Sequence, residues 1–203
     1  MKDALALAAA LLAIIAVVPY IIDVLKKRTK PNIVSWFTWT VLTGVATAAA
    51  IAANEPRTAL LIGASTLCTA AVVVVGFWNG VAKFSWFDGL CQVGAVAGLV
   101  LWLVFNSPTI GIVIPVAIDF IVMLPTLRHA WLKPGEETWQ TFFIGSLAAV
   151  LTMTSLDRLS INSVLYPIYL FVANGLIVLA VIYRRRQFGM SLSRAIVEPI
   201  SKA

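Results

Sequence analysis

The chain has little charge, little cysteine and one histidine. Only 12% of its 203 residues are charged, whereas a soluble domain carries roughly a quarter. His129 stands alone at a predicted helix end, so His dyads and His-based metal clusters fit poorly, and neither HExxH nor GxSxG occurs. Cys68 and Cys91 fall in apolar segments and give no disulfide framework. These absences argue against an enzyme, and we expect no cofactor and no metal.

Long runs without charge take the place of a polar surface. The composition is 61% hydrophobic with a mean hydropathy of +0.95. A helix needs about 20 apolar residues to cross a bilayer, and in lipid only helices or closed barrels satisfy the backbone. The alternation of apolar and polar residues typical of barrel strands is missing. We therefore predict an all-α membrane protein with seven transmembrane helices, at 4–25, 33–53, 58–78, 86–105, 109–131, 138–156 and 161–183.

Basic residues set the expected orientation. The loops after helices one, three and five, together with the tail 184–203, hold 12 of the 15 Lys and Arg residues, and the other side holds Lys2, Arg57 and Arg158. Basic loops stay on the cytoplasmic side. The basic cluster KKRTK follows the first helix, which is the wrong flank for a cleaved signal peptide. We expect a bacterial plasma (inner) membrane protein with its N-terminus outside and its C-terminus cytoplasmic. The net charge of +6 then suits anionic lipid and requires no nucleic acid.

A signature occurs twice in the chain. KPNIVSWFTW at 30–39 reappears as KPGEETWQTF at 133–142, and each copy follows a predicted out-to-in helix and a basic loop. Three helices form each unit, 4–78 and 109–183, and the single helix 86–105 lies between them. A three-helix unit ends on the side opposite its start, so one extra crossing gives both units the same orientation. The prediction is one transmembrane domain with a 3+1+3 arrangement of two parallel three-helix repeats and a linker helix.

These residues resemble the PQ-loop and SWEET transporter superfamily. The first copy runs from Pro19-Tyr20 through KKRTK to Ser35-Trp36, and the second from Pro125-Thr126 to Thr138-Trp139. The stretch from FSWFDGLCQVGAVAG to DFIVMLPTLRHAW is also similar to a bacterial branch of seven-helix membrane proteins. The resemblance implies the 3+1+3 architecture and passage of a solute along the axis between the units.

Two polar residues are expected at mid-membrane. Asp119 lies near the middle of the fifth helix, where an ionised carboxylate costs roughly 2.5–3.5 kcal/mol unless it is paired, hydrated or protonated. It is either a proton-coupling and substrate-binding acid or a structural carboxyl that joins two helices. Asn174, followed by Gly175 in the seventh helix, offers an amide to a solute or to a neighbouring helix.

Aromatic residues and prolines repeat between the units. Trp36 and Trp39 share a helical face, and Trp139 and Phe142 repeat their spacing. They are either interfacial anchors or a substrate-binding cytoplasmic gate for a ring-shaped or cationic solute. Pro19 and Pro125 occupy matching places in the first and fifth helices and are expected to act as hinges, although proline is also tolerated in membrane helices without movement.

The combined interpretation is a transporter, either a facilitator or a proton-coupled carrier, for a small polar or aromatic solute. Its partners would be that solute and the lipid bilayer, and the sequence leaves a homo-oligomer open. The alternative is a non-transporting seven-helix sensor or assembly protein, whose tail RRRQFGMSLSRAIVEPISKA would dock a partner or lie on lipid.

Overall fold

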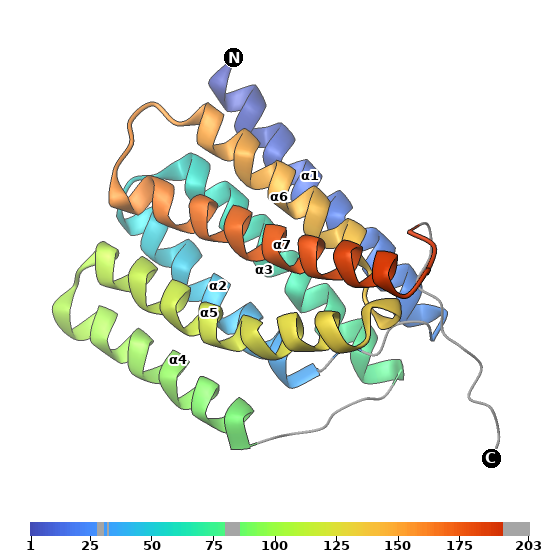
Figure 1. Cartoon of the computed structure of the whole chain (residues 1–203). Coiled ribbons are helices and arrows are strands. Elements are labelled where there is room, and N and C mark those ends of the chain that lie inside the picture. Colours follow the sequence, from blue (N-terminus) through green and yellow to red (C-terminus); the bar gives the residue numbers. More distant parts are fainter. Residues whose placement is uncertain (28–30, 32, 80–85, 193–203) are drawn as a thin grey trace.

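The computed structural model describes residues 1–27, 31, 33–79 and 86–192. Within that part the chain folds into seven α-helices and one short 3₁₀ turn, η1 (Figure 1). The helices are α1 (Lys2–Leu25), α2 (Ile33–Ala52), α3 (Pro56–Asn79), α4 (Trp86–Phe105), α5 (Pro108–Leu132), α6 (Trp139–Ser155) and α7 (Ile161–Gln187), and η1 is Pro134–Glu136. The predicted all-α class is confirmed. Each predicted helix lies within two residues of the observed one, except that α7 continues to Gln187.

The helix boundaries follow from local chemistry. Pro108 occupies the first turn of α5, where a missing backbone N–H costs nothing, and Asn106 before it has a positive φ. Asn54 has a positive φ in the turn between α2 and α3, a conformation that asparagine tolerates better than most residues. Ser160 and Ser163 form a reciprocal capping box at the start of α7. These polar residues end and restart the apolar helices.

Five of the seven helices in the described part are long and apolar enough to cross a membrane: α1, α2, α3, α5 and α7. Helix α6 has only 17 residues. Large apolar side chains such as Leu7, Leu11 and Ile15 are exposed on α1, whereas its alanines at 6, 9, 10, 13 and 16 are buried. Small residues inside and large apolar residues outside are typical of helices packed together in lipid. The structure is consistent with a multi-pass membrane protein.

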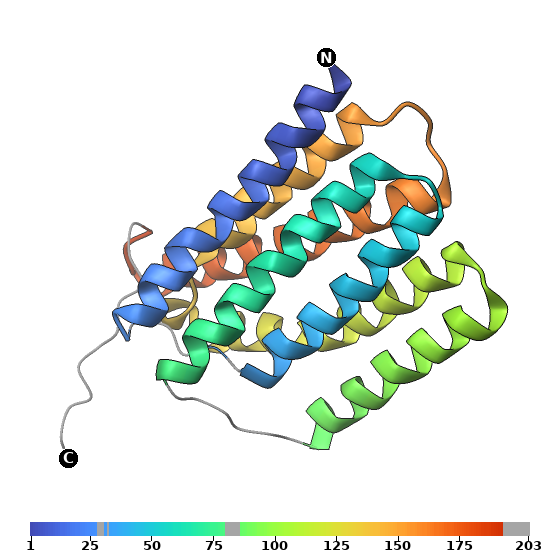
Figure 2. The ribbon, with the colours of Figure 1, turned by 180° about the vertical axis from the view of Figure 1, so that it is seen from behind.

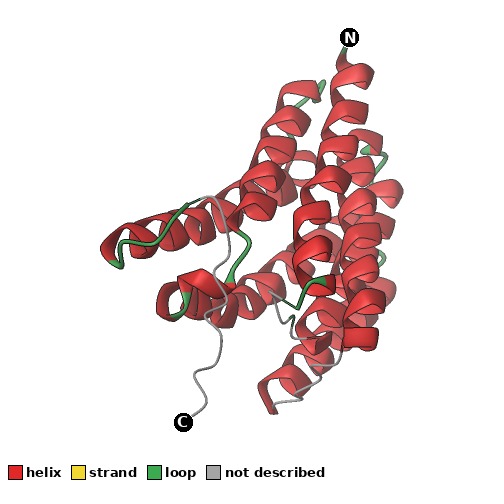
Figure 3. Cartoon of the chain, turned by 90° about the vertical axis from the view of Figure 1, so that its right-hand side faces the viewer, coloured by secondary structure: helices red, strands yellow, loops and turns green. Residues whose placement is uncertain are grey.

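Six helices close into a ring. Helix α1 packs against α3 and α6, α2 packs against α3 and α5, and α7 packs against α5 and α6. The order around the ring is therefore α1, α3, α2, α5, α7, α6, as the two opposite views show (Figures 1 and 2). Helix α4 stands outside this ring, against α5 and α2. The view from the side shows that every element of the described part is a helix or a loop (Figure 3).

The two ends of the bundle differ in how they are held. The N-terminal end, with Met1 and the loops 53–55 and 156–160, carries an ionic cluster. The Arg57 guanidinium donates to Asp3 Oδ1 at 2.8 Å and to the Ser155 carbonyl at 2.8 Å, and it pairs with Asp157. Lys2 Nζ lies 3.1 Å from Asp157 Oδ1. This N-terminal cluster ties the starts of α1 and α3 to the loop between α6 and α7.

We predict that Arg57→Met lowers the Tm of the purified protein, and that Arg158→Met lowers it much less. Arg57 has a side chain only 19% exposed and joins three partners, whereas Arg158 is 71% exposed and lies 3.8 Å from Glu55. A long exposed pair contributes little. The measurement is thermal unfolding of both variants in the same detergent. Equal shifts would show that the N-terminal cluster does not hold this end together.

The same cluster predicts a loss of stability in acid. Lys2 and Arg57 lower the pKa of Asp157 below its ordinary value. The contribution of Asp157 is therefore fully present above the unfolded-state pKa, about 3.9, and is lost as the pH falls through the lower folded-state pKa. Asp157→Asn should flatten the acid side of the Tm-versus-pH curve, and an unchanged curve would contradict this assignment.

Candidate functional site

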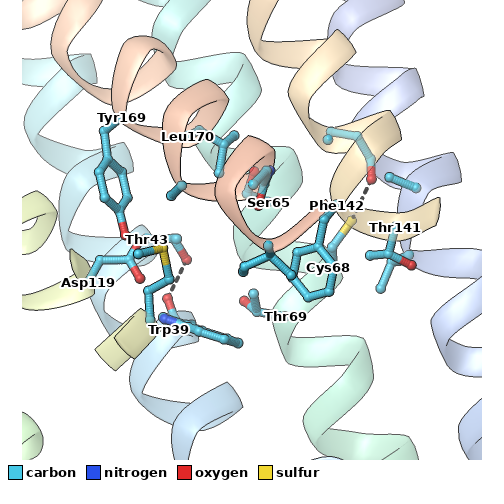
Figure 4. A pocket seen from close by; sticks show the side chains of 18 of the residues that line it. Trp39, Thr43, Ser65, Cys68, Thr69, Asp119, Thr141, Phe142, Tyr169 and Leu170 are labelled. Atoms are coloured by element: carbon cyan, nitrogen blue, oxygen red, sulfur yellow. Dashed lines mark hydrogen bonds between the residues drawn. The ribbon is translucent and has the colours of Figure 1, made fainter. Parts of the chain in front are cut away.

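A cavity of about 130 Å³ lies within the ring of six helices. Every helix of the ring contributes to its wall, and α4 does not. The close view shows its side chains converging from separate helices (Figure 4). The wall residues are Ala13, Ala16, Val17, Trp36, Trp39, Thr43, Ser65, Cys68, Thr69, Asp119, Met123, Thr141, Phe142, Gly145, Tyr166, Tyr169, Leu170, Ala173, Asn174 and Ile177.

Among the described residues, Asp119 is the one Asp or Glu in the cavity wall. It lies in the middle of α5, and only 8% of the residue is exposed. The side chain of Tyr169 reaches toward the carboxylate from α7, and Trp39 lies on the other side (Figure 4). The buried indole N–H of Trp39 makes no hydrogen bond of good geometry. The acid therefore faces the interior of the ring rather than lipid, with two aromatic residues as its polar neighbours.

Asn174 reaches the same cavity from α7. Its amide packs against Gly145 of α6, where an added Cβ would lie 2.7 Å from Asn174 Nδ2. A Cβ on the adjacent Gly175 would meet nothing within 4 Å. The residue that makes room for this amide is therefore Gly145. Sequence reasoning selected Gly175 because it is next to Asn174, and only the packing of α6 on α7 identifies the other glycine.

The first aromatic pair lies together in the cavity wall. The rings of Trp36 and Trp39 are 5.1 Å apart and nearly perpendicular, and Tyr20 of α1 packs 4.8 Å from Trp36. Trp36 is 8% exposed and Tyr20 is 4% exposed. Aromatic rings prefer such edge-to-face contacts. This arrangement buries Trp36 in the interior of the ring, which distinguishes it from an anchor at a lipid interface.

The second aromatic pair is divided. Phe142 is buried in the cavity wall, but Trp139 is not among the wall residues. Its ring packs against Phe143 at 6.0 Å, and its Nε1 donates to the Leu192 carbonyl at 2.9 Å. The predicted equivalence with Trp36 therefore does not extend to the cavity. Trp139 instead holds the segment that follows α7, through its hydrogen bond to Leu192.

The structure describes the two predicted hinge prolines to different extents. Pro19 lies inside α1, which remains helical from Lys2 to Leu25, and it does not line the cavity. Pro125 falls within α5, but its side chain lies outside the described residues. Their expected role as hinges stays a prediction.

A buried arginine organises the opposite end of the bundle. This tail end holds residues 26–27, 133–138 and 188–192. Arg185 is 1% exposed and donates to three backbone carbonyls, those of Pro134 at 2.9 Å, Glu137 at 2.9 Å and Ser191 at 3.2 Å. Asp23 and Glu137 are its acidic neighbours.

The acidic neighbours of Arg185 are themselves held in place. Asp23 accepts a hydrogen bond of 2.8 Å from Thr138 Oγ1, and Glu137 is only 7% exposed. Sequence reasoning missed this cluster, because RRR at the end of an apolar run is usually a solvated cytoplasmic flank. The Asp23–Thr138 bond joins α1 to the start of α6, so this end also connects the two halves of the chain.

Comparison with models of known families, with characterised proteins and with solved structures found no match.

We predict opposite outcomes for alanine at the two glycines. Gly175→Ala should stabilise the protein by up to about 1 kcal/mol, because alanine is the better helix former and the space is open. Gly145→Ala should lose that gain, because its methyl group must displace the Asn174 amide. Chemical or thermal unfolding of both variants measures the difference. Equal stabilisation would mean that Asn174 does not need Gly145.

Proposed function

We propose that the chain is a transporter, either a facilitator or a proton-coupled carrier, for a small solute in the plasma membrane. Its two three-helix units would be parallel repeats of the PQ-loop and SWEET type, with the solute pathway between them. The observation that carries the proposal is the cavity, which contains the carboxyl of Asp119 and is surrounded by three helices from each unit.

The order of the helices supports the parallel repeats. In the first unit α3 packs between α1 and α2, and in the second α7 packs between α5 and α6. If α1, α2 and α3 are equivalent to α5, α6 and α7, the contacts between the units agree as well, since α2 packs against α5 and α1 packs against α6. A half-turn about an axis through the ring exchanges these equivalent helices and keeps their order around the ring, whereas inverted units would reverse that order. A two-fold axis through the cavity would therefore relate the units.

The ends of the ring support alternating access. The N-terminal cluster around Arg57 joins α1 and α3 to the loop after α6, and at the tail end Asp23 and Thr138 join α1 to α6. Each set of contacts crosses from one unit to the other, so breaking either set would open one side of the cavity. The basic residues of the tail end agree with a cytoplasmic location there, and Pro19 and Pro125 would allow the helices to bend.

The alternative is a non-transporting sensor or assembly protein with the same fold. One observation favours it: the segment after α7 is held against the bundle, through Ser191 on Arg185 and Leu192 on Trp139. A fixed exit direction for the tail would suit a docking segment.

Asp119→Asn tests proton coupling. A thermal-shift panel of sugars, amines and aromatic compounds on the purified chain would first identify a ligand, whose uptake into liposomes is then measured across a range of pH. The variant should lose pH-dependent uptake while keeping its expression and helix content, because an amide cannot exchange the proton. Uptake with an unchanged pH profile would exclude coupling through this residue. Asp119→Glu is the matched control, because it keeps an exchangeable proton at the same place and should retain pH-dependent uptake.

Removal of residues 193–203 separates the two candidate functions. A carrier should keep its uptake rate, because the deletion spares the carbonyls of Ser191 and Leu192 that Arg185 and Trp139 use. A docking protein should lose its partner. Deletion of 189–203 is the informative control, since it removes those carbonyls and should lower the Tm. Loss of uptake by the shorter deletion, in a protein of normal Tm, would contradict the expectation that transport does not need the tail.

A further inference from the structure

The cavity wall carries acidic but no basic side chains. Its residues include Asp119 and contain no Lys, Arg or His in the part of the chain that the structure describes. Two arginines of the ring lie at its ends and are hydrogen-bonded there: Arg57 donates to Asp3, and Arg185 donates to the Pro134 carbonyl. A solute with a carboxylate or phosphate would therefore leave its charge without a counter-ion at low dielectric, which is strongly unfavourable.

Three hydroxyl groups of the wall use their hydrogens within their own helices. Ser65 Oγ donates to the Leu61 carbonyl at 3.1 Å, Thr43 Oγ1 to the Trp39 carbonyl at 2.7 Å, and Thr69 Oγ1 to the Thr66 carbonyl at 3.0 Å. A hydroxyl has one hydrogen and two lone pairs, so these three groups can offer a solute only oxygen lone pairs. Thr141 Oγ1 and the Trp39 indole N–H have no hydrogen-bond partner of good geometry. The three acceptors, together with the Asp119 carboxylate, suit a solute that donates hydrogen bonds.

Aromatic rings make up much of the remaining wall. Trp36 and Trp39 come from α2, Phe142 from α6, and Tyr166 and Tyr169 from α7. The faces of such rings attract cations, and Trp is the strongest of them. A bare metal ion fits less well, because hard cations need several oxygen ligands, commonly with more than one carboxylate, and the described residues contain no group of three or more His, Cys, Asp or Glu side chains that could hold one.

We propose that the solute bound in this cavity is a small protonated amine without an acidic group, with its ammonium on Asp119 and its carbon skeleton among the aromatic rings. This assignment deepens the proposed function, since it rests on the cavity being the solute site. The size follows from the volume: at about 130 Å³, the cavity approaches the roughly 150 Å³ apolar cavity that binds benzene. Tyr169 and Trp39 flank the carboxylate and would fix its position (Figure 4).

Three probes of one shape test the charge preference. The full chain in nanodiscs at neutral pH is titrated with cyclopentylamine, cyclopentanol and cyclopentanecarboxylate, and binding is followed by calorimetry and by the fluorescence of the wall tryptophans. The amine should bind about ten-fold more tightly than the alcohol or better, because a hydrogen bond to a charged group is worth more than a neutral one. The carboxylate should not bind. Equal affinity for amine and alcohol, preference for the carboxylate, or no binding of the amine would each overturn the proposal.

Two substitutions locate the effect. Asp119→Asn should reduce the affinity for the amine to about that for the alcohol, and circular dichroism of the variant reports whether its helices are still folded. Asp119→Glu should retain a preference for the amine. If Asp119→Asn keeps the full preference, Asp119 is not the ammonium site and the proposal fails. If Asp119→Asn does not fold, the Glu variant decides: it must prefer the amine over the alcohol, and equal affinity overturns the assignment.

Flux through liposomes separates this proposal from the carrier itself. Tight binding of cyclopentylamine without flux would support the amine site and reject the transporter. Flux of cyclopentanol at the rate of the amine would retain the transporter and reject the amine preference.

Discussion

The constraint on which this structure depends is the placement of a carboxyl group in the middle of a helix that is long and apolar enough to cross a membrane. An ionised carboxyl is costly in such surroundings, and the ring turns Asp119 inward, onto Tyr169 and Trp39 and away from the outer surface of the bundle. Turning it inward requires a helix on every side, so α5 needs both α2 and α7 as neighbours. The same requirement explains why small residues occupy the interior: alanines on α1 and Gly145 on α6 leave room for the few polar and aromatic side chains that meet in the cavity.

Polarity inside the ring is handled by two different means. Within the ring, the hydroxyls of Thr43, Ser65 and Thr69 donate their hydrogens to backbone carbonyls of their own helices, whereas the Trp39 indole N–H and Thr141 Oγ1 have no partner of good geometry. At the ends, charges are used in pairs and networks, with Arg57 at one end and the buried Arg185 at the other. Because Arg185 and Glu137 are buried, removing one partner of the tail-end network is expected to be costly. In the proposed carrier these charged contacts at the two ends, rather than the apolar packing between them, would decide which side of the cavity is closed.

The sequence predicted the helices well and the site in part. Charge-free runs of about 20 residues leave little choice in lipid, which explains why seven predicted helices match the observed ones. The signature repeat directed attention to Trp36, Trp39 and Phe142, all of which line the cavity. It also implied the same for Trp139, whose ring turns to Phe143 and Leu192 instead. Periodicity gives the face of a helix but not its rotation against neighbours. For the same reason Tyr166, Tyr169, Gly145 and Arg185 escaped notice, since only packing between distant helices reveals them.

If the two three-helix units are the parallel repeats proposed above, they supply the same positions with different chemistry. If Pro19 and Pro125 are equivalent, Asp119 corresponds to Ala13, and both line the cavity. Likewise Trp39 corresponds to Phe142 through the repeated signature, and both lie in the wall. A duplicated wall would give a cavity with identical halves, but here the carboxyl and both tyrosines belong to the second unit, while the two tryptophans belong to the first. Charge is therefore confined to one side of the proposed axis. In the proposed carrier, a solute would therefore bind in a single orientation, and a proton or ammonium at Asp119 would alter the contact of α5 with α2 without an equal change on the other side.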